Sequence, residues 1–189
     1  YPVISTLSAA GVHVHEITGE AEDPKRIIPT SLGSPDEIAE LLERELANGG
    51  CAVVIRNTVR EAQETYDAVK AVFGREQTTL LHSRFLAAER AARDRRMLEL
   101  FGKGATRRPQ RHVVVATQVI EQSLDVDFDL MLTDPAPMDL VLQRIGRLHR
   151  HERADRPVGL REARCLVLVE DLFAVPWAYS TGTDHVYSR

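Results

Sequence analysis

The chain has 189 residues and a formal net charge of -4, with 43% of its residues hydrophobic and 28% charged. This length fits one domain with a buried core, and the composition excludes a disordered or fibrous protein. The acidic net charge argues against a protein that binds nucleic acid over its whole surface. No apolar run approaches the roughly 20 residues that cross a membrane, and no signal-peptide pattern opens the chain, so we expect no membrane partner and a cytoplasmic location.

The first clear element is a helix that begins after Ser34. This serine has the character of an N-cap, a proline follows at the first helical position and a glutamate at the third, and Asn48-Gly49-Gly50 ends the helix after Ala47. Beyond it, apolar runs of strand type alternate with segments of helical spacing. The expected strands are 51–56, 78–81, 112–117, 128–133 and 163–170, and the expected helices are 58–73 with a capping box at Thr58, 86–101, and one that starts at Met138. Alternation over five units predicts an α/β fold, a mostly parallel sheet with helices on both faces.

The two ends of the chain are less regular. We assign residues 1–33 to lead-in strands, with a strand-like pattern at 11–17, residues 34–170 to the main domain, and residues 171–189 to a C-terminal extension or linker. Because the chain begins at Tyr1-Pro2 without a methionine, we expect it to be part of a longer natural chain. Cys51 and Cys165 are far apart with no second ligand nearby, so we expect buried strand residues and no metal site.

The most informative segment is Gln143–Arg150, with the sequence QRIGRLHR. If it is helical, Gln143, Arg147 and Arg150 fall at i, i+4 and i+7 and project from one face. Arginines in this arrangement can hold a phosphate chain and neutralise the charge on a transferred phosphoryl group, the arginine-finger role. An arginine-rich helix is also commonly no more than a solvated surface, so the preceding segments decide between the two interpretations.

One of those segments is an apolar strand that ends in Thr117 and Gln118. It would present a hydroxyl and an amide at the carboxyl edge of the sheet, where open α/β folds bind ligands. Asp125 follows after a short connection and could accept a hydrogen bond from a ribose hydroxyl or orient an arginine. Taken singly, Thr117 is equally suited to cap a helix and Asp125 to form an Asx-turn.

Together these segments resemble the motifs of superfamily 2 helicases. VVVATQVIEQSLDVDFD (113–129) resembles motif V, QRIGRLHRH (143–151) motif VI, CAVVIRNTVREAQ (51–63) motif IV, and LLHSRFLAAER (80–90) the strand and helix that follow it. The combination of ATQVIEQSLD, DFD and PAPMDLVLQRIGRLHRH resembles the CRISPR-associated helicase–nucleases of type I systems more than the DEAD-box RNA helicases. The resemblance covers residues 50–151 and implies the second RecA-like domain of such a helicase.

The resemblance also implies roles for residues of this chain. Arg147 and Arg150 would be the arginine fingers, Gln143 would order the nucleotide site, and Asp125 would contact the nucleotide or couple it to the fingers. Seven residues would contact single-stranded DNA: Asn57, Thr58, His82, Ser83, Arg84, Thr117 and Gln118. For His82, the interpretation as a helix-capping or core histidine stands beside the functional one.

A motor of this class also needs a P-loop, in which glycine-rich backbone, a lysine and a Ser or Thr hold phosphates and magnesium. The chain has no such motif, since Gly102-Lys103-Gly104 lacks both the upstream glycine and the hydroxyl. Its one Asp-Glu pair, Asp36-Glu37, sits at a helix start and not after an apolar strand, and it has no His-Asp dipeptide for a metal-dependent nuclease. We therefore expect this chain alone to be inactive, with ATP and Mg²⁺ bound mainly by the first RecA-like domain of the same polypeptide.

The resemblance further implies recruitment by an RNA-guided surveillance complex. Two other functions remain open from the residues alone. One is a domain of another superfamily 2 helicase acting on DNA or RNA, which the 2'-hydroxyl dependence would decide. The other is a non-catalytic RecA-like module that binds nucleic acid, which the missing P-loop favours and the Gln143, Arg147 and Arg150 pattern opposes.

Overall fold

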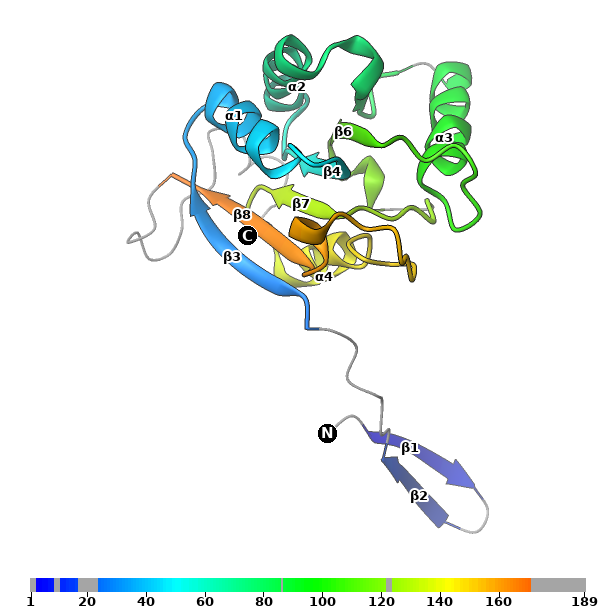
Figure 1. The fold of residues 1–189 in the computed structure, drawn as a ribbon. Coiled ribbons are helices and arrows are strands. Elements are labelled where there is room, and N and C mark those ends of the chain that lie inside the picture. Colours follow the sequence, from blue (N-terminus) through cyan, green and yellow to red (C-terminus); the bar gives the residue numbers. More distant parts are fainter. Residues whose placement is uncertain (1–2, 9–10, 17–23, 86, 122–123, 171–189) are drawn as a thin grey trace.

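The computed structural model describes residues 3–8, 11–16, 24–85, 87–121 and 124–170. Within these ranges the chain forms a hairpin and a larger α/β unit (Figure 1). The hairpin consists of β1 (Val3–Ser8) and β2 (Gly11–Glu16), which pair antiparallel. The expected C-terminal extension 171–189 lies outside the described residues.

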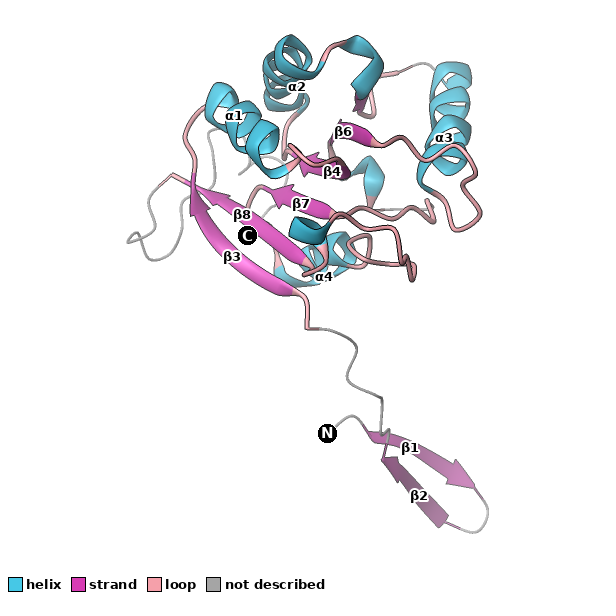
Figure 2. Cartoon of the chain, viewed as in Figure 1, coloured by secondary structure: helices cyan, strands magenta, loops and turns pink. Residues whose placement is uncertain are grey.

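The larger unit is built on a six-stranded sheet in the order β3-β8-β7-β4-β6-β5, in which every pairing is parallel. The strands are β3 (Arg26–Ser31), β4 (Gly50–Ile55), β5 (Thr78–Leu81), β6 (Arg111–Ala116), β7 (Leu130–Thr133) and β8 (Arg164–Val169). The helices are α1 (Pro35–Glu45), α2 (Val59–Phe73), α3 (Ala87–Phe101) and α4 (Met138–Ile145). Figure 2 shows these helices around the central strands, which confirms the predicted α/β fold.

The sheet is covered on both faces because successive residues of its central strands point to opposite sides. In β4, Cys51 and Val53 belong to the core that includes α3 and α4, whereas Ala52 and Val54 belong to the core that includes α1 and α2. All six residues of β4 are buried, as expected for a parallel strand with helices on both sides. Figure 1 shows α1 and α2 on one side of the sheet and α4 on the other.

The predicted capping box at Thr58 is present, and the predicted N-cap Ser34 forms one as well. The Ser34 hydroxyl accepts a hydrogen bond from Glu37 N at 3.2 Å, and the Glu37 carboxylate accepts one from Ser34 N at 3.0 Å. Thr58 and Glu61 repeat this arrangement at the start of α2. Each box satisfies backbone N–H groups that a helix start leaves unpaired, so the sequence pattern alone located both helix starts.

Several element ends differ by one or two residues from the sequence-based expectation, and two differences have a tertiary cause. The sheet begins before residue 34, because β3 lies in the segment assigned to lead-in strands and pairs with β8. The strand expected to start at Phe128 starts at Leu130, because Phe128 forms an isolated parallel bridge with Leu148 of a later loop. A pairing so distant in sequence leaves no signal in the local pattern.

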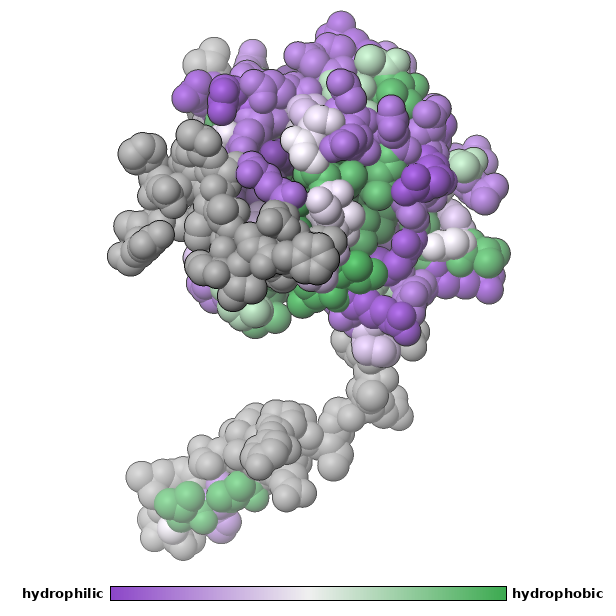
Figure 3. Space-filling view, turned by 90° about the vertical axis from the view of Figure 1, so that its left-hand side faces the viewer, coloured by the Kyte–Doolittle hydropathy of each residue, from purple (hydrophilic) through white to green (hydrophobic). Residues whose placement is uncertain are grey.

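The two edge strands of the sheet are β3 and β5. Successive residues of a strand direct their backbone N and O to opposite neighbours. Arg26 N donates to Ala163 O beside β8, so the backbone nitrogen of Pro29, three residues later, faces the open side. In β5, Leu81 O accepts from Thr117 N on the β6 side, so Leu80 O faces the open side, where it accepts from Arg93 Nη1 at 3.2 Å. Figure 3 views the side on which β3 lies in Figure 1, and an apolar area lies there beside hydrophilic areas. Ile27, an exposed residue of β3, is 46% exposed.

Candidate functional site

The seven residues expected to contact a nucleic-acid strand gather at the carboxyl ends of three neighbouring strands. Asn57 and Thr58 come after β4, His82, Ser83 and Arg84 after β5, and Thr117 and Gln118 after β6. The groups are joined directly, since Gln118 Nε2 donates to Asn57 O at 2.8 Å and Thr117 N donates to Leu81 O at 3.0 Å. We call these seven residues the strand-edge group. Parallel strands put their carboxyl ends at one edge, which is where open α/β sheets bind ligands.

Members of the strand-edge group differ in exposure. Ser83 and Arg84 are exposed, whereas Asn57 and Thr117 are 2% exposed. Asn57 Nδ2 donates to Pro135 O at 2.8 Å, and Thr58 accepts from Glu61 N in the capping box, so both side chains hold the local backbone. Their predicted contact with a strand stays a prediction, and Ser83 and Arg84 are the members whose side chains a strand can reach.

His82 supports the loop that carries those two residues. Its Nδ1 accepts a hydrogen bond from Arg84 N at 3.2 Å, and its ring stacks on Phe85 with the ring centroids 4.1 Å apart. Burial lowers the pKa of His82, and the charges of Arg93 and Arg84 lower it further, so the imidazole is neutral near pH 7. The structure therefore gives His82 the role of a buried support, with the adjacent exposed residues as the candidate contacts.

A second group forms around Asp125. Arg150 Nε donates to Asp125 Oδ1, and His151 Nε2 lies 3.4 Å from the same oxygen. The hydrogen bond from Arg150 lowers the pKa of Asp125, and the nearby His151 lowers it further. This carboxylate therefore stays ionised. Arg147 is half-buried, and its Nη2 donates to Glu121 O at 3.0 Å. Burial, together with the charge of Arg150, lowers the pKa of the Arg147 guanidinium.

The geometry proposed for Gln143, Arg147 and Arg150 is wrong. Helix α4 ends at Ile145, so the three residues do not share a helix face. Arg147 and Arg150 instead belong to residues 146–151, which we call the finger segment and which has no regular secondary structure. The helix stops because the finger segment pairs with the chain before β7: Phe128 N donates to Arg147 O and His149 N to Phe128 O, both at 3.0 Å. Gln143 is exposed on α4, and in the described part of the chain its side chain makes no hydrogen bond with Asp125, Arg147 or Arg150.

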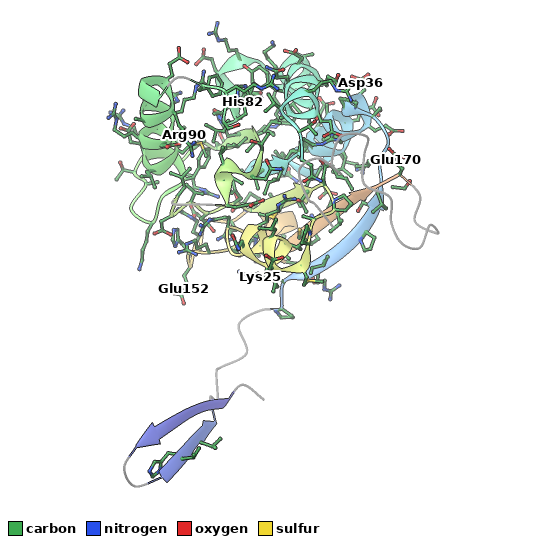
Figure 4. The ribbon with its side chains drawn as sticks, turned by 180° about the vertical axis from the view of Figure 1, so that it is seen from behind. Lys25, Asp36, His82, Arg90, Glu152 and Glu170 are labelled. Carbon is green, nitrogen blue, oxygen red and sulfur yellow. The ribbon has the colours of Figure 1, made fainter. Side chains whose placement is uncertain are left out.

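His82 of the strand-edge group and the loop after the finger segment lie at different ends of the domain. Figure 4 shows His82 near Arg90 and far from Lys25 and Glu152. Lys25, which comes before β3, lines a cavity with Arg150 and Glu152. The loop after β5 and the cavity beside Arg150 are thus two separate surfaces. The Arg147 guanidinium contacts the chain just after Gln118 of the strand-edge group, since it donates to Ile120 O and Glu121 O.

Sequence reasoning missed the residue that connects these surfaces. Arg144, in the last turn of α4, is fully buried and its Nε donates to Glu121 Oε1 at 2.7 Å. Its Nη1 donates to Thr133 Oγ1 at 2.7 Å, and its Nη2 donates to Asn57 Oδ1 at 3.3 Å. One side chain therefore bonds to the strand-edge group and anchors the helix before the finger segment. The sequence shows only an arginine among arginines, because nothing local marks it as buried.

It also missed a cluster of buried charges beneath the finger segment. We call it the buried ion cluster, and its members are Asp127, Asp129, Arg108, Arg153 and Arg156. Asp127 and Asp129 are 0% and 2% exposed. Charged side chains are almost never fully buried unless they are paired, and here each carboxylate faces more than one guanidinium. The sequence signal for this cluster is the D-F-D pattern at 127–129, but a family motif alone gives no sign that its aspartates are buried.

Other features bear on cofactors. Cys51 and Cys165 are buried in β4 and β8, as predicted, and burial raises the pKa of each thiol to about 12. In the described ranges no group of three or more His, Cys, Asp or Glu side chains is arranged to hold a metal ion. None of the described helices is long and apolar enough to cross a membrane.

The family described as CRISPR-associated nuclease/helicase Cas3, C-terminal, matches residues 48–153, more than half of the chain. The chain belongs to this Cas3 family. It is 40% identical over 168 residues to the CRISPR-associated nuclease/helicase Cas3 of Streptococcus thermophilus, covering 89% of this chain and 18% of the relative. It is 38% identical over 180 residues to the Cas3 endonuclease/helicase of Escherichia coli K12, covering 90% of this chain and 20% of the relative. The chain thus spans about a fifth of the length of these Cas3 proteins.

Solved structures agree with the Cas3 assignment and with the RecA-like fold. The crystal structure of T. fusca Cas3-AMPPNP matches 99% of this chain, and 23% of that one, with a TM-score of 0.86 at 34% identity. A chain of a CRISPR RNA-guided surveillance complex, pre-nicking, matches 94% of this chain, and 23% of that one, with a TM-score of 0.74 at 32% identity. The C-terminal domain of the DEAD-box protein Dbp5 shares the fold, with a TM-score of 0.54 at 18% identity over 81% of this chain and 80% of that domain.

Proposed function

We propose that this chain is the C-terminal motor half of an ATP-dependent helicase that moves along single-stranded DNA in type I CRISPR interference, an antiviral defence. The observation that carries the proposal is that Arg147 and Arg150 lie on one segment fixed to the domain, with Arg147 bonded to Glu121 O and Arg150 paired with Asp125. Membership of the Cas3 C-terminal family supports it, since that family is described as nuclease/helicase.

The residues present fit the phosphates of ATP but not its magnesium. Arg147 and Arg150 supply two guanidiniums, which bind phosphate oxygens and neutralise charge that develops during phosphoryl transfer. Because no acidic metal cluster occurs among the described residues, Mg²⁺ and most of the nucleotide would be bound by a P-loop in another RecA-like domain of the same polypeptide. Asp125 would orient Arg150 or accept a hydrogen bond from the ribose, and Gln143 would order the site from α4.

Closure of the two domains would bring the finger segment onto the phosphates. Arg147 and Arg150 would then leave their present acceptors, Glu121 O and Asp125, for phosphate oxygens, and hydrolysis would return them. Arginine fingers contribute on the order of 10³–10⁵ in rate. This chain alone has the fingers and no P-loop, so we expect negligible ATP hydrolysis from it.

The exposed Ser83 and Arg84 are the proposed contacts with the DNA backbone. Phosphate contacts tolerate any sequence and weaken as salt rises. Alternating strand contacts in two domains would convert opening and closing into steps along the strand. We also propose an RNA-guided surveillance complex as the cytoplasmic partner, because part of a chain in such a complex matches 94% of this chain.

The test is DNA-stimulated ATP hydrolysis by this chain alone and by the full product of its gene. In the full product, Arg147→Ala should lower kcat by at least about 10³-fold. Arg75→Ala is the matched control, because Arg75 is an exposed arginine at the amino end of β5, away from both surfaces. Its kcat should stay within about twofold of the parent, as for surface substitutions in general.

Each other outcome selects a different account. Hydrolysis by the chain alone would mean that a complete nucleotide site lies within these residues. An Arg147→Ala variant as active as the parent would contradict the finger role and leave a nucleic-acid-binding module as the better function.

A second experiment tests the proposed DNA contacts. Arg84→Ala should weaken binding of single-stranded DNA and reduce the slope of log K against log salt by about one. Tighter binding of RNA of the same sequence would favour an RNA helicase.

A further inference from the structure

The finger segment is held by the chain just before β7. Phe128 bonds to it through its backbone on both sides of Leu148, with Arg147 O and His149 N as its partners. His149 has a backbone φ of 44°, a left-handed conformation that is uncommon for residues other than glycine. Such a conformation persists only where surrounding contacts impose it. The main chain that carries both arginines is therefore fixed from outside the finger segment.

Asp127 supplies the side-chain part of that fixation. Its Oδ1 accepts hydrogen bonds from the backbone nitrogens of Arg150 at 2.7 Å and His151 at 3.3 Å. Arg153 Nε donates to Oδ2 of the same carboxylate at 2.6 Å, and Arg156 Nη2 lies 2.9 Å from Oδ1. Burial raises the pKa of Asp127, but the guanidiniums, with Arg156 first, outweigh it and leave the pKa below its ordinary value. An ionised buried carboxylate thus holds the backbone at Arg150 through hydrogen bonds.

Asp129 provides a natural comparison within the same cluster. Its carboxylate accepts hydrogen bonds from Cys51 N at 2.7 Å and Arg108 Nη2 at 2.8 Å, and also from Arg156. It is as buried as Asp127 and shares two guanidiniums with it. In contrast to Asp127, its carboxylate makes no hydrogen bond or ion pair with the finger segment among the described residues. Asp129 is bonded to that segment through its backbone O, which lies 3.2 Å from His149 Nε2 and which an alanine keeps. A comparison of variants at the two aspartates therefore distinguishes an effect on the stability of the cluster from an effect on the position of the finger segment.

We propose that Asp127 is a positioning residue for ATP hydrolysis, which sets the main-chain position from which the Arg150 guanidinium reaches the nucleotide. The inference rests on the proposed finger role of Arg150. Asp127 itself touches neither phosphate nor DNA and acts through the Arg150 backbone. A displacement of about 1 Å at a reacting geometry lowers rates on the order of 10²-fold, so the loss of these hydrogen bonds should be visible in kcat.

The experiment compares Asp127→Ala and Asp129→Ala in the full product of the gene. Both variants remove one buried carboxylate that faces Arg108 and Arg156, so both should lower the thermal midpoint by similar amounts. Only Asp127→Ala should lower kcat for DNA-stimulated ATP hydrolysis, by about 10²-fold, with the KM for ATP within about threefold of the parent. If either alanine variant does not fold, Asp127→Glu and Asp129→Glu keep the charge and move the carboxylate by one methylene, and the same contrast is expected.

A double-mutant cycle shows whether Asp127 acts through Arg150. The double variant Asp127→Ala/Arg150→Ala should have the same kcat as the single variant Arg150→Ala. Independent losses that multiply, or equal losses of kcat at Asp127 and Asp129, would overturn the inference. An Arg150→Ala variant with parental kcat would instead overturn the proposed function. A tenfold or greater loss at Arg150 with parental kcat in Asp127→Ala would overturn the positioning role alone.

Discussion

Replacement of Arg144 by methionine tests the buried connection between the two candidate surfaces. The guanidinium pairs with Glu121, whose side chain is 4% exposed, and also donates to Thr133 Oγ1, Asp134 O and Asn57 Oδ1. Methionine fills part of the volume but has no hydrogen-bond donor, so the Glu121 carboxylate and three other acceptors lose a donor in a buried site. Breaking one side of a buried ion pair costs about 3–5 kcal/mol.

That magnitude is a large share of the roughly 5–15 kcal/mol by which a domain is stable. For a domain of this size, 1 kcal/mol corresponds to about 2–4 °C, so Arg144→Met should lower Tm by roughly 6–20 °C. The assay is urea unfolding followed by circular dichroism, with thermal unfolding beside it. Arg161→Met is the matched control, because Arg161 is exposed and should change stability by less than about 0.5 kcal/mol.

The double variant Glu121→Gln/Arg144→Met separates charge from packing. It removes both charges of the pair, so it should recover at least half of the stability that Arg144→Met loses. A loss below about 1 kcal/mol in Arg144→Met would refute the reasoning, because the guanidinium could not then hold the buried contacts described.

Three further predictions follow from buried or strained positions. Burial lowers the pKa of His112 to about 4 in the folded chain, against 6.5 for an ordinary histidine, so the unfolded state binds the proton first. The free energy of unfolding should fall by up to about 3 kcal/mol as pH drops from about 6.5 to 4, and His112→Gln should flatten that fall in pH-dependent urea titrations. Gly50→Ala should destabilise by more than about 2 kcal/mol by calorimetry, because φ is 115° there and a Cβ would overlap the Leu160 side chain, and an unchanged Tm would contradict this. Thr58→Ala should cost about 1 kcal/mol through the lost helix cap, and a DNA-binding defect without a change in stability would show instead that Thr58 contacts the strand.

The parts of the fold that local patterns specify were predicted from the sequence. The capping boxes at Ser34 and Thr58 are read from residues three apart, and the parallel sheet from the alternation of buried strands with amphipathic helices. For the strand-edge group, the strand pattern alone placed Thr117 and Gln118 at the carboxyl edge of the sheet, and the other five residues came from the family resemblance. Because parallel strands bring their carboxyl ends together, all seven lie at the ends of three neighbouring strands.

The interior of the site was not predictable in the same way. The end of α4 at Ile145 depends on Phe128 and Asp127, which bond to the finger segment about twenty residues away in sequence. A helical pattern through Arg150 would satisfy local rules equally well, so only the tertiary pairing decides. The burial of Arg144 likewise depends on Glu121 and Asn57 from two other loops. Nothing in the sequence next to Arg144 indicates that this arginine is buried.

The edge strands of the sheet have a consequence for how the domain meets other molecules. An uncovered strand edge recruits further strands, from partners or from other unfolded chains. Here Pro29 removes a donor from the open side of β3, and the Arg93 guanidinium occupies a carbonyl on the open side of β5. Strand addition is thereby disfavoured at both ends of the sheet. We therefore expect the domain to resist edge-to-edge aggregation when it is separated from its neighbours, and to meet them through side chains and loops.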